Sequence, residues 1–435
     1  MTTSTHLVAT RRFLPLFVTQ LLGAFNDNLF KNAMILHVVY NVYNSEAAEA
    51  WFSAVASALF IIPFVTLSGL AGQLADMRDK AGIIRIVKFC EILIMLVGGA
   101  GLVMAWLDMN QTLAIGLMLL ALFGMGVHST FFGPIKYAIL PQHLKPGEVL
   151  AGTGLVEAGT YIAILAGTIL AGWIAIEWAA LAVVVTALVG YASGRQVPPA
   201  PPLIDAQPLD FNIVSSSINL IRNTLQDRRV FEAIIAISFF WAVGTVLFIQ
   251  FPPLAKNVLH ASKEVTSVMM VVFSVGVAIG SIAINALLKG TVSARYSMPS
   301  VLMMGLFVVL FYLVCHTWQP APGGELLNVP RFLHHPGAIN LLLSLLGIAV
   351  AGGMFVVPLY AFLTTFVEKS QAARTIAANN IINSTAMVIG ALVAVGMTAM
   401  KVPLTEQVLL SAVLCVVSAW LGLLLYRSEK AALAR

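Results

Sequence analysis

The chain has 435 residues, of which 59% are hydrophobic and only 10% are charged. Soluble domains carry about 25% charged residues, so this composition excludes an ordinary water-soluble protein and indicates one that crosses a membrane many times. The formal net charge is +5, and the positions of the basic residues explain it without a nucleic-acid partner. The three cysteines, Cys90, Cys315 and Cys415, lie in apolar stretches and have neither disulfide-framework nor metal-ligand spacing.

Apolar stretches of membrane-crossing length follow one another along almost the whole chain. A bilayer-spanning helix takes about 17 to 25 residues, and twelve stretches meet that length. They cover residues 13–41, 51–75, 83–106, 111–133, 149–174, 177–194, 229–254, 264–288, 298–317, 337–363, 374–400 and 404–426. The sequence therefore predicts an all-α membrane protein with twelve transmembrane helices.

The basic residues are distributed unevenly between the two sides of the membrane. If the N-terminus is cytoplasmic, the outer loops hold only Lys256, Lys263, Arg331 and Lys401, whereas most of the 24 lysines and arginines fall in inner loops and tails. Because loops rich in Lys and Arg stay on the cytoplasmic side, we expect both termini in the cytoplasm.

Residues 195–228 interrupt the apolar pattern in the middle of the chain. They contain a proline-rich run at 198–202, polar residues and an amphipathic piece near 211–225. We interpret this segment as a cytoplasmic linker, with the amphipathic piece as a possible helix on the inner membrane surface. The predicted domains are then a six-helix bundle at 1–194 and a second at 229–435.

An internal repeat supports two related halves. The segment YAIL, beginning at Tyr137, follows the fourth stretch, and YAFL, beginning at Tyr360, ends the tenth. The segments AGTGLVEAGT (151–160) and AANNIINSTA (377–386) resemble each other more loosely. Two six-helix halves in parallel duplication are typical of the major facilitator superfamily, so we predict that fold.

The loop after the second stretch carries a motif associated with conformational change. It reads GQLADMRDK from Gly72 to Lys80 and resembles the G-x-x-x-D-x-x-G-R signature of major facilitator proteins, with Asp79 and Lys80 in place of Gly and Arg. In such a motif the acid caps a neighbouring helix or pairs with a base in one conformation and releases it in another. Gly72, Asp76, Arg78 and Lys80 are the candidate switch residues, and an ordinary charged turn is the alternative.

Charged and amide side chains interrupt the first apolar stretch. Asn26, Asp27, Asn28 and Lys31 lie within GAFNDNLFKNA at 23–33. A carboxylate at membrane depth costs about 2.5–3.5 kcal/mol on insertion scales, so such groups usually face a cavity. Asp27 and Lys31 share a helical face and are expected to neutralise each other. A purely structural pair is the alternative to a substrate-binding role.

Further candidate cavity residues lie in, or directly after, four other stretches. They are His128, Lys136, Glu157, Trp241, Asn379, Asn380 and Asn383. Asn379 and Asn383 share a face of the eleventh helix, where amides often hydrogen-bond to neighbouring helices. A neutral interhelical hydrogen bond is the alternative for His128, and extension of the side chain to the interface is the alternative for Lys136. Glu91, near the inner edge, is expected to pair with Lys88 or with the loop.

Four segments together resemble the bacterial lysophospholipid transporter (LplT) family. They are FNDNLFKNA at 25–33, GPIKYAIL at 133–140, Glu157 within GLVEA, and GGMFVVPLYAFL at 352–363. Family members occur alone or fused to acyltransferase domains, so a separate acyltransferase is an expected functional partner. Where members carry an arginine in helix 7 and an acid in helix 11, this chain has Phe248 and Asn383. Lys31 can supply the missing positive charge locally.

The resemblance implies a transporter that flips lysophospholipids of the phosphatidylethanolamine and phosphatidylglycerol types from the outer to the inner leaflet of the bacterial inner membrane. We expect alternating access by a monomer among membrane lipids, without enzymatic activity, cofactor, metal or nucleic acid. Two alternatives remain open. One is a proton-coupled exporter of drugs or small metabolites, in which Asp27, His128 and Glu157 titrate. The other is a non-transporting membrane partner of an acyltransferase.

Overall fold

The structure is a computed structural model that describes residues 6–42, 46–205, 208–210, 212–224, 226–319 and 326–433. Over these residues the chain is helical, and the one β-pairing is an isolated bridge between Ala261 and Leu327. The all-α class predicted from hydropathy is confirmed.

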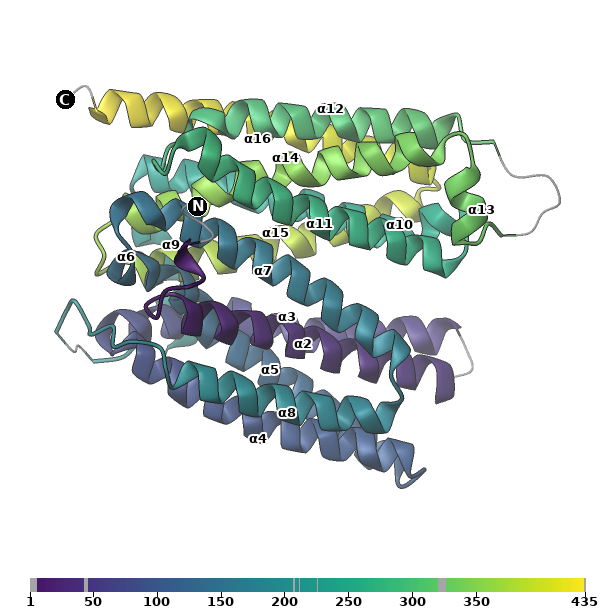
Figure 1. Cartoon of the computed structure of the whole chain (residues 1–435), viewed down its shortest axis with the longest axis horizontal. Helices are drawn as coiled ribbons and strands as arrows, with labels where there is room; N and C mark the ends of the chain where they lie inside the picture. The colour runs from purple at the N-terminus through teal and green to yellow at the C-terminus, as the bar shows by residue number, and fades with distance from the viewer. Residues whose placement is uncertain are drawn as a thin grey trace. The chain divides into compact units, whose positions relative to one another are not determined.

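The first half of the chain forms six long helices at the predicted positions, drawn from purple to teal in Figure 1. Two short helices, α6 (Leu140–His143) and α9 (Ile213–Thr224), accompany them. The long helices are α2 (Leu14–Asn41), α3 (Glu46–Met77), α4 (Lys80–Trp106), α5 (Gln111–Ala138), α7 (Pro146–Trp173) and α8 (Ile176–Gly194).

The second half repeats this arrangement. A 3₁₀ turn at Ala294–Tyr296 precedes α12, and the short helix α13 spans Val329–His334. The long helices are α10 (Arg228–Asn257), α11 (Lys263–Leu288), α12 (Ser297–His316), α14 (Ala338–Thr365), α15 (Ala372–Ala399) and α16 (Leu404–Leu433).

Eleven of the long helices in the described part of the chain are apolar enough to cross a membrane. The helix outside that set is α2, whose polar residues around Asp27 lower its hydropathy. Its 28 residues make it about 42 Å long, which is more than the ~30 Å hydrocarbon layer needs. The predicted twelve crossings therefore correspond to twelve helices of sufficient length.

The chain forms two compact units. The first comprises residues 1–224 and 364–381, and the second comprises 225–363 and 382–435. In the first unit, α2 packs on α7 and α8, α4 packs on α5 and α8, and α3 packs on α5 and α9. In the second unit, α16 packs on α10 and α12.

The segment after α8 is docked on the first unit over its proline-rich part. Val197 and Ala200 are buried, and the backbone N–H of Ala200 donates to Asp79 Oδ1 at 2.7 Å. The N–H of Lys80 donates in turn to the carbonyl of Ala200 at 3.0 Å. Further on, α9 contacts α3 through a hydrogen bond between Gln73 and Ser216.

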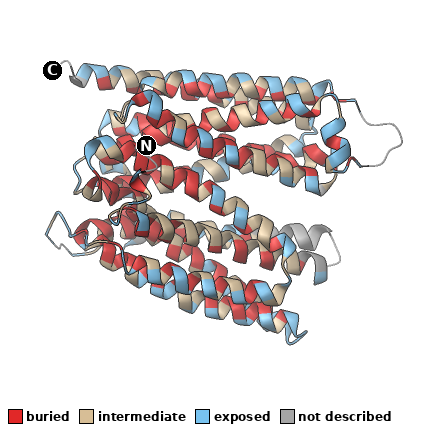
Figure 2. Ribbon diagram, viewed as in Figure 1, coloured by how far each residue is buried: buried red, intermediate tan, exposed pale blue. Residues whose placement is uncertain are grey.

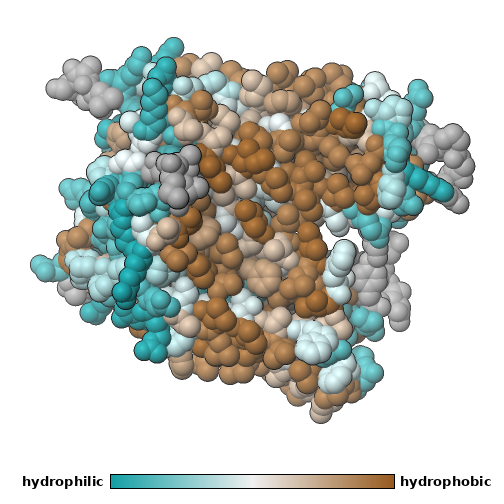
Figure 3. All heavy atoms as spheres, in the orientation of Figure 1, coloured by the Kyte–Doolittle hydropathy of each residue, from teal (hydrophilic) through white to brown (hydrophobic). Residues whose placement is uncertain are grey.

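Buried residues line the helix faces that meet other helices (Figure 2). Many of the exposed residues on the helices are large hydrophobic ones. On the face drawn in Figure 3, hydrophobic side chains cover the middle of the helices while hydrophilic ones gather at helix ends. Helices that are apolar both where they pack on other helices and where they are exposed are suited to a lipid environment.

Candidate functional site

The carboxylate of Asp27 is bound by a neighbouring helix. Ser129 on α5 donates its hydroxyl to Asp27 Oδ2 at 2.7 Å, and the other oxygen, Oδ1, is buried without a hydrogen-bond partner among the described residues. Lys31 lies within electrostatic range of Asp27, as the helical spacing predicts, although the two side chains form no direct ion pair. Lys31 Nζ instead lies 5.7 Å from the centroid of the Phe60 ring on α3. The sequence therefore located the acid and its nearby cation, but not the serine that hydrogen-bonds to the acid.

A fully buried charge network lies next to Asp27. Glu91 on α4 forms an ion pair with Lys88 and accepts a hydrogen bond from the amide of Asn26 at 2.9 Å. His128 Nε2 lies 3.2 Å from the same carboxylate, and His128 Nδ1 lies 3.4 Å from Ser129 Oγ. Polar atoms thus connect Asp27 to Glu91 through Ser129 and His128, across α2, α4 and α5.

Glycines on two helices make room for the buried lysine of this network. A Cβ added at Gly23 on α2 would lie 3.0 Å from Lys88 Nζ, and one added at Gly190 on α8 would lie 3.4 Å from it. Gly194, one turn further along α8, approaches the Lys88 stem just as closely. Lys88 lies inside the first unit. Because the side chain is paired and enclosed, it contributes nothing to the cytoplasmic surface charge.

The remaining amides of α2 turn back toward their own helix. Asn28 donates to the carbonyl of Ala24 at 2.8 Å, and Asn32 donates to the carbonyl of Asn28 at 2.8 Å and to Thr168 Oγ1 at 3.1 Å. Asn32 therefore links α2 to α7, as does Gln20, whose Oε1 accepts a hydrogen bond from Thr160 Oγ1 at 3.0 Å. The hydrogen bond of Asn28 stays within α2 and gives no support to its predicted cavity role.

Lys136 and Glu157 form a second charged group in the first unit. Glu157 on α7 is buried and accepts a hydrogen bond from the hydroxyl of Tyr137 on α5. Lys136 is half-buried, with its Nζ 4.9 Å from the centroid of the Tyr137 ring. The ammonium group lies within electrostatic range of both Glu157 and Asp27. One lysine therefore lies near acids on two other helices.

The second unit holds a neutral counterpart of this group. Asn383 on α15 accepts from Ser238 Oγ at 2.7 Å and donates to the Tyr360 hydroxyl at 3.3 Å. Trp241 Nε1 donates to the same hydroxyl at 2.9 Å. In the alignment of the repeat, Tyr360 matches Tyr137 and Asn383 matches Glu157. The two halves therefore keep the same tyrosine contact, with an acid in one and an amide in the other.

Asn379 and Asn380 lie at the part of α15 that belongs to the first unit. Asn379 is fully buried, and neither of its side-chain polar atoms has a hydrogen-bond partner among the described residues. Asn380 Nδ2 lies 3.1 Å from where a Cβ on Gly133 would be. Glycine at 133 thus allows the polar side chain of α15 to approach α5 closely.

The loop between α3 and α4 contacts the start of α15. Asp76 Oδ1 accepts a hydrogen bond from the backbone N–H of Ala373 at 3.2 Å, and Oδ2 lies 3.3 Å from Arg374 Nε. A Cβ on Gly72 would lie 2.8 Å from that of Ala377, so this crossing admits only glycine without a shift. Lys80 is buried within electrostatic range of Asp76, whereas Arg78 is exposed.

Several residues of these networks carry no motif that singles them out. Ser129 and Tyr360 are common membrane-helix residues. Asn26 was a candidate from the sequence, and its side chain contacts Glu91 on α4. The one sequence feature that points to Tyr137 and Tyr360 is that they occupy matching positions in the internal repeat. In the described part of the chain, no group of three His, Cys, Asp or Glu residues is arranged to hold a metal ion.

Comparison with known proteins identifies the family. The profile of the Major Facilitator Superfamily matches residues 16–391. The chain belongs to the major facilitator superfamily. A bacterial homologue of the iron transporter ferroportin, solved in its outward-facing state, has the same fold, with a TM-score of 0.70 at 13% identity over 97% of this chain and 100% of that one.

Two relatives show which members of this superfamily the chain is similar to. The lysophospholipid transporter LplT of Serratia proteamaculans is 24% identical over 391 residues, covering 87% of each chain. LplT of an Enterobacter species is 26% identical over 378 residues, covering 85% of this chain and 84% of that one. The resemblance inferred from four short segments is thereby confirmed along most of the chain. This major facilitator protein is thus a multi-pass membrane transporter similar to LplT.

Proposed function

We propose that this protein flips lysophospholipids from the outer to the inner leaflet of the bacterial inner membrane by alternating access. The observation that carries the proposal is the electrostatic proximity of Lys136 to Asp27 and Glu157, on three helices of one membrane-spanning unit. Charges at such depth are expensive and usually serve a transport pathway. The similarity to LplT proteins supplies the lipid class.

The charge pattern suits a phospholipid headgroup. Lys136 is a compact cation that can pair with a phosphate, and Asp27 and Glu157 can accept hydrogen bonds from an ammonium or hydroxyl group. Asp27 Oδ1, without a partner of its own, is the acceptor best placed to serve this role. Within the second unit, Trp241, Tyr360 and Asn383 form a separate neutral group of hydrogen-bond donors and aromatic rings. A separate acyltransferase would consume the lipid delivered to the cytoplasmic leaflet.

Reconstituted protein provides the test. Proteoliposomes containing fluorescent lysophosphatidylethanolamine are sampled by extraction of the outer-leaflet lipid with albumin. Lys136→Gln should slow lipid movement about tenfold or more, because a charge-assisted hydrogen bond is lost. Lys145→Gln, at the N-terminus of α7, is the matched control and should transport normally. Equal flipping by both variants would remove Lys136 from headgroup recognition, and absence of flipping by the parent protein would overturn the proposal.

The line of polar atoms from Asp27 to Glu91 favours a second candidate, a proton-coupled exporter of soluble compounds. Ser129 and His128 bridge the two acids at hydrogen-bond or near-hydrogen-bond distances. If protons are coupled, transport should follow an imposed pH gradient and His128→Gln should abolish that dependence. Lipid flipping that ignores the pH gradient would exclude this candidate.

A further inference from the structure

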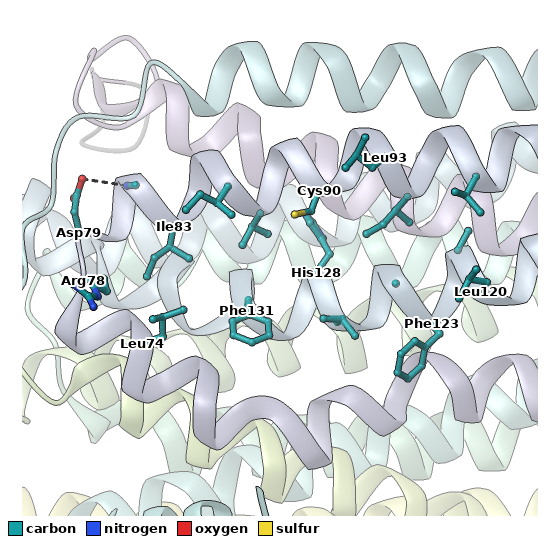
Figure 4. A pocket seen from close by; sticks show the side chains of 18 residues that line it. Leu74, Arg78, Asp79, Ile83, Cys90, Leu93, Leu120, Phe123, His128 and Phe131 are labelled. Carbon is teal, nitrogen blue, oxygen red and sulfur yellow. Dashed lines mark hydrogen bonds between the residues drawn. The ribbon is translucent and has the colours of Figure 1, made fainter. Parts of the chain in front are cut away.

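An apolar groove runs along the surface of the first unit between α4 and α5, and the end of α3 lies beside it (Figure 4). Its volume is about 830 Å³. Ile86 and Leu93 on α4 and Leu120 on α5 line it and are 66%, 49% and 59% exposed, so the groove is open along its length. An open apolar groove on a membrane helix bundle is accessible to the lipid around it.

The groove has the length of one acyl chain. Its lining on α4 runs from Gly82 to Val97, which spans about 22 Å at the helical rise of 1.5 Å per residue. Half of the ~30 Å hydrocarbon layer is about 15 Å, so an acyl chain of one leaflet fits within it. The buried imidazole of His128 is the polar group in the middle of the wall, and its Nε2 is turned to Glu91.

One end of the groove carries an exposed cation. Arg78 lies at that end and forms no salt bridge with any described residue (Figure 4). The neighbouring carboxylate of Asp79 is already engaged, because it accepts hydrogen bonds from the backbone N–H groups of Ala81, Gly82 and Ala200. The guanidinium of Arg78 is therefore available to an anion, and its planar donors match a phosphate.

We propose that the groove binds a diacyl phospholipid with a net negative headgroup, such as phosphatidylglycerol. One acyl chain lies between α4 and α5, and the phosphate pairs with Arg78. The opening along the groove leaves the second chain in the bilayer, which distinguishes this occupant from the single-chain lipid proposed as cargo. The bound chain also covers the side of His128 that faces the groove. The site is separate from Asp27, Lys136 and Glu157 and does not depend on the transport proposal.

Native mass spectrometry of the full-length protein in detergent tests whether the charge of Arg78 contributes to lipid binding. Phosphatidylglycerol and phosphatidylcholine are titrated against the parent, Arg78→Ala and Arg195→Ala. Arg195 is another exposed arginine, at the end of α8, and serves as the matched control. The first phosphatidylglycerol should bind about tenfold more weakly to Arg78→Ala, and Arg195→Ala should match the parent. Equal binding by the two variants, or no preference for phosphatidylglycerol over phosphatidylcholine, would overturn the proposal.

A second pair of variants tests the groove itself. Cys90 is exposed and lines the groove, so Cys90→Trp fills it, whereas Leu188→Trp adds the same bulk to an exposed position on α8. Only Cys90→Trp should lose tight phosphatidylglycerol binding. Lysophosphatidylglycerol should bind the parent more weakly than the diacyl lipid. If the single-chain lipid binds more tightly, or if Cys90→Trp retains the parent's affinity, the diacyl site is refuted.

Discussion

The buried pair of Lys88 and Glu91 shows how one residue depends on its partner. Removing one member of a buried ion pair costs about 3–5 kcal/mol, because the other charge stays desolvated and unpaired. We therefore predict that Glu91→Leu lowers the free energy of unfolding by about that amount. The double variant Lys88→Met/Glu91→Leu should recover most of the loss. Denaturant unfolding in detergent, followed by tryptophan fluorescence, measures both, and a Glu91→Leu protein as stable as the parent would contradict the prediction.

At the same scale, the sequence identified the unusual residues better than their contacts. Asp27 stood out because its charge interrupts an apolar stretch, but the helical spacing suggested Lys31 as its partner. The observed donor, Ser129, lies on α5 and is ordinary in composition. Spacing along one helix describes that helix alone. A partner supplied by another helix depends on packing, which no local pattern in α2 contains.

Close helix crossings give the clearest prediction at the scale of elements. A Cβ at Gly126 on α5 would lie 2.5 Å from the carbonyl oxygen of Phe60 on α3, whereas one at Gly116 in the same helix meets nothing within 4 Å. Gly126→Ala must push α3 away and should destabilise the protein. Gly116→Ala should leave stability unchanged or raise it by up to about 1 kcal/mol, because alanine favours helix over glycine. Thermal unfolding of the two variants measures the contrast, and equal midpoints would contradict it.

Hydropathy predicted where the helices lie in the sequence, but it did not predict how the segments between them interact. All twelve predicted stretches coincide with long helices, since the membrane requires long apolar segments whatever their partners. The docking of residues 197–200 was not foreseen, because proline-rich composition indicates a spacer. Its cause is the carboxylate of Asp79, which caps α4 and also binds the N–H of Ala200. An aspartate before a helix predicts a helix cap, and nothing in the sequence shows that the same carboxylate also binds a distant backbone N–H.

For the whole molecule, the repeat was the most informative signal. It predicted which residues correspond in the two halves, and Tyr137–Glu157 and Tyr360–Asn383 make corresponding contacts. The repeat could not predict that the first half would hold the charges and the second would be neutral. Duplication preserves backbone geometry, while the side chains that serve a headgroup or an ion diverge. The division into domains at residues 194 and 229 stays a prediction, because the first unit also includes residues 364–381.

The contact between Asp76 and α15 carries a prediction for conformational change of the molecule. Asp76 binds the first turn of α15, a helix that continues from the first unit into the second. Losing a helix cap costs about 0.5–2 kcal/mol, so Asp76→Asn should speed hydrogen exchange of backbone amides near Ala373 roughly two- to thirtyfold. Lipid flipping should slow as well, because a switch contact must form and break in each cycle.

Asp79→Asn is the control for this experiment, because Asp79 lies three residues away and caps α4 instead. Its effect on hydrogen exchange should be confined to the start of α4 and to Ala200. Mass spectrometry after deuterium labelling of the detergent-solubilised protein separates the two regions. Unchanged exchange at the start of α15 in Asp76→Asn would show that the ion pair and cap do not hold that helix. If Asp76→Asn slows flipping while hydrogen exchange at the start of α15 stays unchanged, Asp76 acts in transport by some means other than its contact with Ala373 and Arg374.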